Sequence, residues 1–148
     1  MSESARGRNP GLLDRAECMN LLRSVGLGRA AWTEEDGRVV VEPVNFAVAS
    51  DMVAFGTAAG SKLDAARRRA PFSFEVDDVE PALRTGWSVL VHGTPEIVTD
   101  PVEIERLAPN LQPPWDESAP KPYLVLLAIE EVSGRRLPLS PGGVTWSG

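Results

Sequence analysis

The sequence has very few residues that bind transition metals: its 148 residues include one cysteine, Cys18, and one histidine, His92. A lone cysteine cannot form a disulfide within the chain, which suits a reducing compartment such as the cytoplasm. One thiolate and one imidazole also cannot supply the ligands of an ordinary tetrahedral zinc site. We therefore expect a cytoplasmic protein without a structural metal, in which Cys18 belongs to the core and His92 is structural or exposed.

Positive charge and long apolar segments are also scarce. Asp and Glu number 21 against 15 Lys and Arg, which gives a formal net charge of −6. A surface of this sign repels nucleic acid unless its basic residues are segregated, so we expect no nucleic-acid partner. The longest apolar run, Tyr123–Ile129, is far shorter than the ~20 residues that span a bilayer, and residues 1–10 lack the apolar stretch of a signal peptide. The sequence predicts neither a membrane span nor secretion.

Two well-known catalytic motifs are missing as well. A Walker A loop needs four residues between its glycines and Lys before Ser or Thr, whereas Gly56 and Gly60 enclose three residues and Ser61 precedes Lys62. Ser88 lacks the second glycine of a nucleophile elbow. We therefore expect no nucleotide triphosphatase, and Ser88 is a poor candidate nucleophile.

The sequence does contain a series of short strand patterns. Apolar residues recur at helical spacing over 12–25, and shorter helices are expected over 61–70 and 101–107. Strand patterns, by alternation or by β-branched and aromatic content, occupy 28–33, 38–48, 52–57, 72–78, 86–98 and 121–132. Strands separated by turns, with only short helices between them, predict a mainly β, antiparallel fold with short helices, in the form of a barrel or a sandwich. Of the two we expect a small barrel.

The length fits one domain with its own core. We expect a single domain over 1–148, with a flexible tail at 1–9, a proline-rich loop at 109–122 and a C-terminal tail at 138–148. A loop of that length without regular structure is often functional, and here we expect it to act as a lid.

Residues 55–69, FGTAAGSKLDAARRR, run from a strand end through glycines into a basic helix. One interpretation is an ordinary helix start, in which Ser61 caps the helix and Asp64 completes a capping box. The other is a phosphate site, because the N–H groups at a helix start, the hydroxyls of Thr57 and Ser61 and the ammonium of Lys62 suit a phosphate monoester. The spacing favours neither interpretation over the other.

The segment VEPVNFAV, residues 41–48, has two further candidates. Pro43 cannot donate to a sheet ladder, so it marks an edge or a bulge. Asn45 alternates with Val44 and Phe46, which places its amide on the opposite face of the strand. Such an edge can hydrogen-bond a planar heterocycle, although a Pro and an Asn of this kind more often end a strand pairing.

Tryptophan is a further candidate ligand contact. Trp87 follows a glycine at the start of a strand, and Trp115 lies in the proline-rich loop, where each can cover an aromatic ligand. Packing is the commoner role of tryptophan because it buries so much area. We assign Trp32 and Trp146 to packing.

Several blocks, PVNF, FGTAAGSKL, FSFEVDD, GWSVLVHG, TDPVE and VSGRRL, occur in an order and spacing that cover about residues 12–137. Together they resemble the pyridoxamine 5′-phosphate oxidase-like family of split β-barrel flavoproteins, especially its small actinobacterial members. The resemblance implies a split β-barrel homodimer with flavin mononucleotide (FMN) at the subunit interface. It also implies which residues surround the cofactor: Pro43, Val44 and Asn45 at the isoalloxazine ring, Thr57, Ser61 and Lys62 at the phosphate, and Trp87 as a wall.

The function that this resemblance implies is that of an oxidoreductase. The bound flavin exchanges hydride or electrons with a small-molecule substrate, while the protein supplies position and electrostatics. One alternative is a binding protein without turnover, which stores or senses a flavin, a deazaflavin or another small molecule. Another is a structural dimer whose site has been lost.

One position departs from the family pattern. Family members usually carry arginine before the threonine, whereas this sequence has Gly56. Loss of a bidentate guanidinium from a phosphate site costs about 1.5–3 kcal/mol. Arg67, Arg68 or a residue of the partner chain are candidate replacements, and a deazaflavin of the F-420 type is the alternative cofactor.

Overall fold

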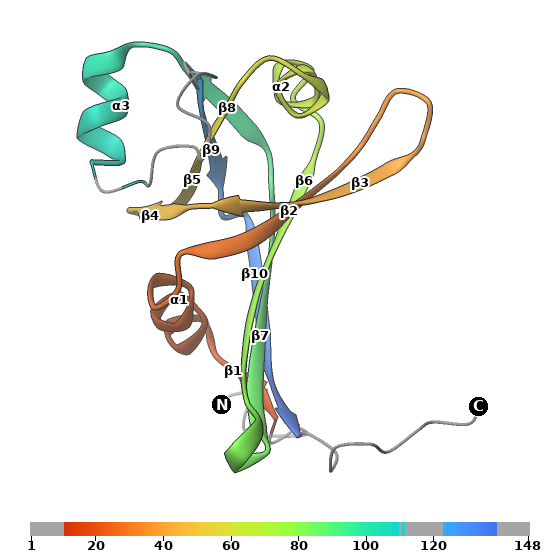
Figure 1. Ribbon diagram of the computed structural model, residues 1–148, viewed down its shortest axis with the longest axis vertical. Helices are drawn as coiled ribbons and strands as arrows, with labels where there is room; N and C mark the ends of the chain where they lie inside the picture. Colours follow the sequence, from red (N-terminus) through yellow and green to blue (C-terminus); the bar gives the residue numbers. More distant parts are fainter. Residues whose placement is uncertain (1–10, 110, 112–122, 139–148) are drawn as a thin grey trace.

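The computed structural model describes residues 11–109, 111 and 123–138 (Figure 1). The expected tail at 1–9 lies outside the described residues, and so do the proline-rich loop and the C-terminal tail apart from their bordering residues. Trp115 and Trp146 fall in these segments, so their expected roles stay predictions.

Strands dominate the described residues, and the helices are short. In chain order the elements are β1 (Leu12–Leu13), α1 (Arg15–Arg23), β2 (Leu27–Thr33), β3 (Val39–Asn45), β4 (Ala47–Ala49), β5 (Met52–Thr57), α2 (Ser61–Arg67), β6 (Phe72–Glu80), the 3-10 turn η1 (Pro81–Leu83), β7 (Thr85–Gly93), β8 (Pro95–Val98), α3 (Pro101–Leu107), β9 (Tyr123–Ala128) and β10 (Glu131–Pro138). Among the described helices, none combines the length and apolar character needed to cross a membrane.

The strands form two antiparallel sheets. The six-stranded sheet has the order β1-β10-β7-β6-β2-β3, and the four-stranded sheet has the order β4-β5-β9-β8. Figure 1 shows α3 beside the four-stranded sheet, whereas the long strands β6, β7 and β10 extend away from it toward the opposite end of the molecule. The expected fold class, mainly β and antiparallel with short helices, is confirmed, and the two sheets do not close into one barrel.

Three segments that read as single strands in the sequence each divide into two strands of different sheets. Segment 38–48 becomes β3 and β4, segment 86–98 becomes β7 and β8, and segment 121–132 becomes β9 and β10. At the second division the two sheets come very close, since a Cβ built on Gly93 would lie 1.8 Å from the carbonyl oxygen of Ala128. The expected single strands are therefore corrected: the chain passes from one sheet to the other within each of them.

The first helix is shorter than the expected 12–25. Leu12 and Leu13 pair with β10, so the helix begins only at Arg15. Asp14 and Glu17 form a capping box, in which the Glu17 N–H donates to Asp14 Oδ1 at 2.8 Å and the Asp14 N–H donates to Glu17 Oε1 at 3.0 Å. The first apolar residues of the helical pattern thus belong to a sheet.

The core lies between the two sheets and is rich in aromatic rings. Phe55, Phe72 and Phe74 are at most 1% exposed. Trp32 stacks on Phe72 with 5.4 Å between ring centroids, which confirms its packing role. Cys18 is buried as expected. The alternation expected in 72–78 is also confirmed, because its phenylalanines point inward and the polar residues between them are half-exposed.

Candidate functional site

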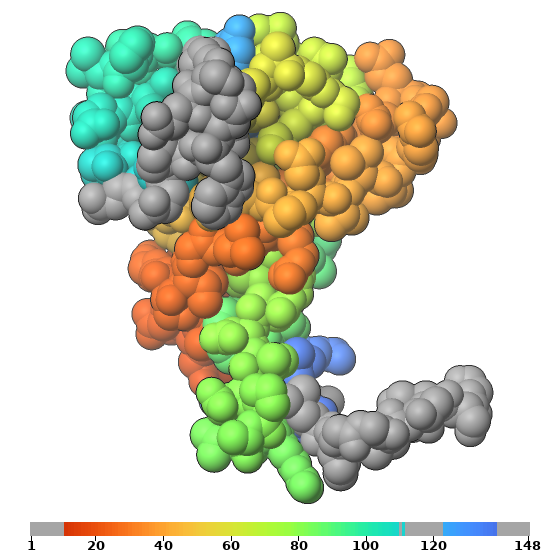
Figure 2. Space-filling view, in the orientation of Figure 1, coloured from red at the N-terminus to blue at the C-terminus, as the bar shows by residue number. Residues whose placement is uncertain are grey.

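The turn between β5 and α2 forms one wall of a hollow of about 220 Å³. We call it the Lys62 hollow, and its lining residues are Glu42, Thr57, Ala58, Ala59, Gly60, Ser61 and Lys62. Figure 2 shows β3 (orange) and the segment before α2 (yellow) side by side on the upper part of the molecule. The three residues expected at the phosphate, Thr57, Ser61 and Lys62, are thus brought together.

The backbone of Gly60 shapes this turn. Gly60 has φ of 153° and serves as the N-cap of α2, with no side chain capping the helix. Other residues rarely adopt this conformation, so glycine is needed where the chain turns from β5 into the helix. Ser61 is already the first helical residue, one position too late to act as the cap. The expected capping box of Ser61 and Asp64 is therefore wrong.

Lys62 is a buried cation with a carboxylate partner. Its side chain is 9% exposed, and its Nζ lies 2.7 Å from Oε1 of Glu42, whose side chain is 47% exposed. The ammonium also lies 5.9 Å from the ring centroid of Phe55, over the ring. The stem of Lys62 thus packs against the core while Glu42 in β3 meets its charge. Sequence reasoning missed Glu42.

The hydroxyl-bearing residues of the hollow, Thr57 and Ser61, differ in their exposure to solvent. Thr57 is 4% exposed, and its Oγ1 donates to the carbonyl of Ala58 at 3.0 Å. Ser61 is exposed at the start of α2. A ligand entering from solvent therefore reaches the Ser61 hydroxyl more readily than the Thr57 hydroxyl.

The arginines that follow on α2 have other partners. The guanidinium of Arg67 lies 5.5 Å from the ring centroid of Tyr123. Arg68 donates to the carbonyl of Thr33 at 3.2 Å and lies 3.5 Å from a carboxylate oxygen of Glu35. Neither arginine lines the Lys62 hollow. In this arrangement neither replaces the arginine that family members carry at the position of Gly56.

Residues 43–45 lie beside the hollow without entering it. They belong to β3, the outer strand of the six-stranded sheet, which confirms the edge expected from Pro43. Val44 is 7% exposed and belongs to the core. Because side chains alternate along a strand, Pro43 and Asn45 project from the face opposite to Glu42 and Val44. The structure therefore does not bring Pro43 or Asn45 to Lys62.

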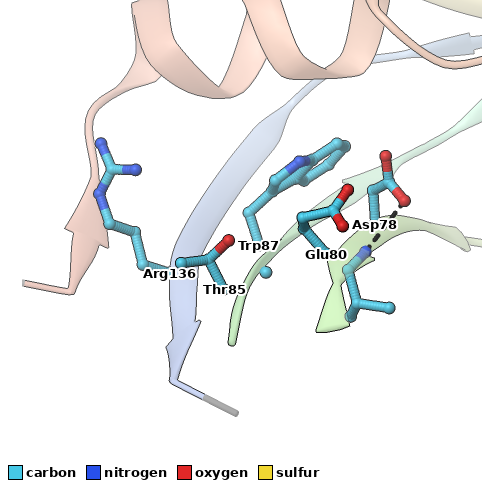
Figure 3. A pocket seen from close by; sticks show the side chains of 7 residues that line it. Asp78, Glu80, Thr85, Trp87 and Arg136 are labelled. Carbon is cyan, nitrogen blue, oxygen red and sulfur yellow. Dashed lines mark hydrogen bonds between the residues drawn. The ribbon is translucent and has the colours of Figure 1, made fainter. Parts of the chain in front are cut away.

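Trp87 lies at a second hollow of about 250 Å³, which we call the Trp87 hollow (Figure 3). It is lined by Asp78, Val79, Glu80, Thr85, Gly86, Trp87 and Arg136. The strand register places Asp78, Trp87 and Arg136 in one row across β6, β7 and β10. Arg136 also lies 3.4 Å from a carboxylate oxygen of Glu17 in α1. Trp87 is thus partly exposed between acidic and basic neighbours.

The two hollows lie far apart within one chain. Figure 1 shows the turn between β6 and β7 at the bottom of the molecule and α2 at the top. The residues expected around one cofactor are therefore separated: Thr57, Ser61 and Lys62 line one hollow and Trp87 lines the other. Pro43, Val44 and Asn45 line neither of the two. His92 also lines neither hollow: it is exposed, as expected, and its Nδ1 lies 2.8 Å from Oγ of Ser73.

The chain also matches a model built from the sequences of a known protein family. The model of pyridoxamine 5′-phosphate oxidase matches residues 14–136. The chain belongs to the pyridoxamine 5′-phosphate oxidase family. The uncharacterized protein Rv0080 of Mycobacterium tuberculosis is 35% identical over 130 residues, which cover 84% of each chain. The family resemblance inferred from the sequence blocks is thereby confirmed.

Solved structures agree with the family and with the fold. An FAD binding protein from Mycobacterium smegmatis is 30% identical with a TM-score of 0.70, and the match covers 88% of this chain and all of that one (100%). An FAD-binding protein from Mesorhizobium loti is 25% identical with a TM-score of 0.70, covering 84% of this chain and 94% of that one. The overall fold is therefore shared with these two FAD-binding proteins.

Proposed function

We propose that this protein is a flavin-binding oxidoreductase that acts on a small molecule as a homodimer. The observation that carries the proposal is the Lys62 hollow, where a buried ammonium and an exposed hydroxyl meet at a glycine turn. Membership of the family and the similarity to two FAD-binding proteins support a flavin as the ligand.

The donor set of the hollow fits a phosphoryl group. The Lys62 ammonium and the Ser61 hydroxyl are both donors, and phosphoryl oxygens are strong acceptors. We expect these two residues to hold the terminal phosphate of FMN or the corresponding phosphate of FAD or of an F-420-type deazaflavin. When bound, such a group supplies hydride or electron transfer to the substrate.

A second copy of the chain completes the site in this proposal. Pockets for ligands of drug size usually measure about 300–1,000 Å³, whereas the two hollows measure about 220 and 250 Å³, so each fits only part of a flavin. We infer that the Trp87 hollow of one subunit faces the Lys62 hollow of its partner, and that Trp87 covers the ring and excludes water. Exposed apolar residues on β2 and on the edge strand β3 favour such an interface, namely Leu27, Val39 and Val41 at 52%, 67% and 62% exposure.

A binding protein without turnover is the second candidate. It is favoured by the Glu42–Lys62 pair and by Gly56, since both weaken the attraction for a phosphate relative to a site with free lysine and arginine. Flavin binding that is followed by no reduction with nicotinamide nucleotides, and by no oxidation of reduced substrates, would favour this candidate over the oxidoreductase.

The first experiment is an absorption spectrum of the purified protein, followed by titration with FMN, FAD and an F-420-type deazaflavin. Sedimentation of the protein with and without ligand tests the dimer. A protein that stays colourless with all three cofactors would contradict the proposal, and a monomer that binds flavin would contradict the shared site.

Lys62→Met tests the phosphate position. Methionine keeps the apolar stem on Phe55 but removes the ammonium, so we expect FMN affinity to fall about tenfold while riboflavin affinity stays constant. Arg23→Met, which removes an exposed charge at the end of α1, is the matched control. If Lys62→Met binds both ligands as the wild type does, the phosphate lies elsewhere.

A further inference from the structure

Glu42 determines what a ligand meets when it reaches Lys62. The carboxylate belongs to β3, 20 positions from its partner in the chain, and contacts the ammonium at 2.7 Å. Lys62 contributes one positive charge to the lining of the hollow and Glu42 contributes one negative charge. The lining is thus formally neutral, although its donors suit an anion.

The neighbouring surface does not restore a positive field. Ser61 also lines a third hollow, of about 260 Å³, together with Glu34, Glu35, Asp36, Asp64 and Arg68. Four of these five neighbours are carboxylates, and Arg68 lies 3.5 Å from Glu35. Arg38 pairs with Glu34 and Asp36, at 3.9 and 3.4 Å, so the arginines of this surface are themselves held by carboxylates. An anion at the Lys62 hollow therefore meets Glu42 at the ammonium and an acidic surface next to Ser61.

The cost of dehydrating a phosphoryl group rises steeply with its charge. A phosphomonoester carries nearly two charges above its second pKa of about 6, whereas each phosphate of a diphosphodiester carries one. A formally neutral lining compensates this cost poorly, and the penalty is larger for the doubly charged group. The terminal phosphate of FMN belongs to the first kind and the phosphates of FAD to the second.

We propose that Glu42 is a specificity-determining residue, which holds the Lys62 ammonium and makes the hollow select singly charged phosphoryl groups over the dianionic phosphomonoester. For flavins this rests on the proposed function, and it deepens it: the preferred ligand is a flavin whose phosphates are singly charged. Glu42 acts through its charge on the ammonium of Lys62.

The test compares the wild type with Glu42→Gln, because glutamine keeps the size and an acceptor for Lys62 but removes the charge. Riboflavin, FMN and FAD are titrated by fluorescence quenching, and inorganic phosphate by calorimetry. We expect Glu42→Gln to raise the affinity for FMN about tenfold relative to riboflavin, and that for FAD by less. Binding of inorganic phosphate should also strengthen above pH 7.

Glu35→Gln is the matched control, because it removes the same charge from a residue that is 80% exposed and pairs with Arg68 outside the Lys62 hollow. We expect it to change the FMN-to-riboflavin ratio less than twofold, since exposed charges are screened by salt. An equal effect of both variants would mean that general surface charge, and not Glu42, controls the site, which would overturn the proposal.

The remaining outcomes separate this inference from the proposed function. If FMN binds more tightly than riboflavin but Glu42→Gln leaves that ratio unchanged or lowers it, the inference is wrong and flavin binding stands. If no flavin binds either protein while phosphate binding strengthens in the variant, the inference stands and flavin binding is wrong. If neither flavin nor phosphate binds either protein, both are wrong.

Discussion

The Lys62 hollow and the Trp87 hollow have similar volumes, about 220 and 250 Å³, but the chain builds them differently. The first is a turn into a helix, where backbone conformation and one compensated cation create a place for a small polar group. The second is a row of side chains across three strands, where an indole offers a flat apolar surface. In the proposed function, a ligand with a phosphate at one end and a ring at the other uses both hollows.

Because the hollows lie at opposite ends of the molecule, their relative position depends on how the two sheets are joined. Gly93→Ala tests that junction. A Cβ at position 93 would lie 1.8 Å from the backbone oxygen of Ala128, so β7 and β9 would have to move apart. We expect a loss of about 3 kcal/mol or more in the free energy of unfolding, measured with urea, and the largest effect among these variants.

Gly26→Ala is the control for this prediction. A Cβ at Gly26 meets nothing within 4 Å, and its φ does not lie in the left-handed region. We expect its free energy of unfolding to stay within about 0.5 kcal/mol of the wild type. If the two alanine variants were equally stable, the close approach of β7 and β9 at Gly93 would not matter for stability.

Trp87→Leu tests whether binding of the ring and binding of the phosphate depend on different hollows. Leucine removes the indole surface but leaves the Lys62 hollow intact, so riboflavin and FMN should both bind about tenfold more weakly. Inorganic phosphate should bind as it does to the wild type. Trp87→Phe, which keeps an aromatic face, should recover part of the flavin affinity.

For Lys62→Met we expect the opposite pattern, in which the affinity for phosphate falls and the affinity for riboflavin stays constant. If Trp87→Leu instead weakens phosphate and flavin equally, the two hollows are not separate parts of one site, and the comparison between them fails.

Much of the fold follows from sequence periodicity. The alternation of Phe72, Phe74 and Val76 with polar residues predicts one buried and one wet face, and the continuous apolar run of 124–127 predicts a strand buried on both faces. Both are found because side-chain period depends on local geometry alone. The passage of a chain segment between sheets leaves no such signal, because the apolar pattern continues through the bend, as it does at Phe46 between β3 and β4.

In the candidate site, too, part of the arrangement follows from the sequence and part only from tertiary packing. Thr57, Ser61 and Lys62 are close in sequence, so one turn brings them together. Glu42 reaches Lys62 only because β3 lies beside β5 and α2, which is a matter of tertiary packing. One signal was present: Glu42 stands between Val40 and Val44 on the inward face of its strand, and an inward carboxylate needs a partner of opposite charge.

Substitution of Glu75 gives the smallest predicted change in stability. Because Glu75 lines neither hollow, its substitution should leave ligand binding unchanged. Glu75 lies on the outer face of β6, 3.3 Å from Arg29 in β2, which also lies 3.1 Å from Asp77. Burial raises the pKa of Glu75 to about 7, Asp77 adds to the shift, and Arg29 opposes it. The folded protein therefore keeps a proton on Glu75 at pH values where the unfolded chain has lost it.

The sign of the pH dependence follows from this difference. Between the ordinary glutamate pKa of about 4.5 and about 7 the folded state binds more protons at Glu75, so this group lowers stability as pH rises through that window. Glu75→Gln removes the titration, and its stability relative to the wild type should increase from pH 5 to pH 8. Because the side chain is 34% exposed, solvent limits the gain to about 1 kcal/mol or less.

Urea unfolding at pH 5 and pH 8 measures this change, with Glu96→Gln on the exposed side of β8 as the control. Flavin and phosphate affinities of Glu75→Gln should match the wild type, because the residue contacts neither hollow. A variant whose stability advantage shrinks with rising pH would show that Arg29 outweighs burial at this position. A variant that changes ligand affinity would show instead that the outer face of the sheet is coupled to the site, and the two hollows could then no longer be treated as independent of the surface between them.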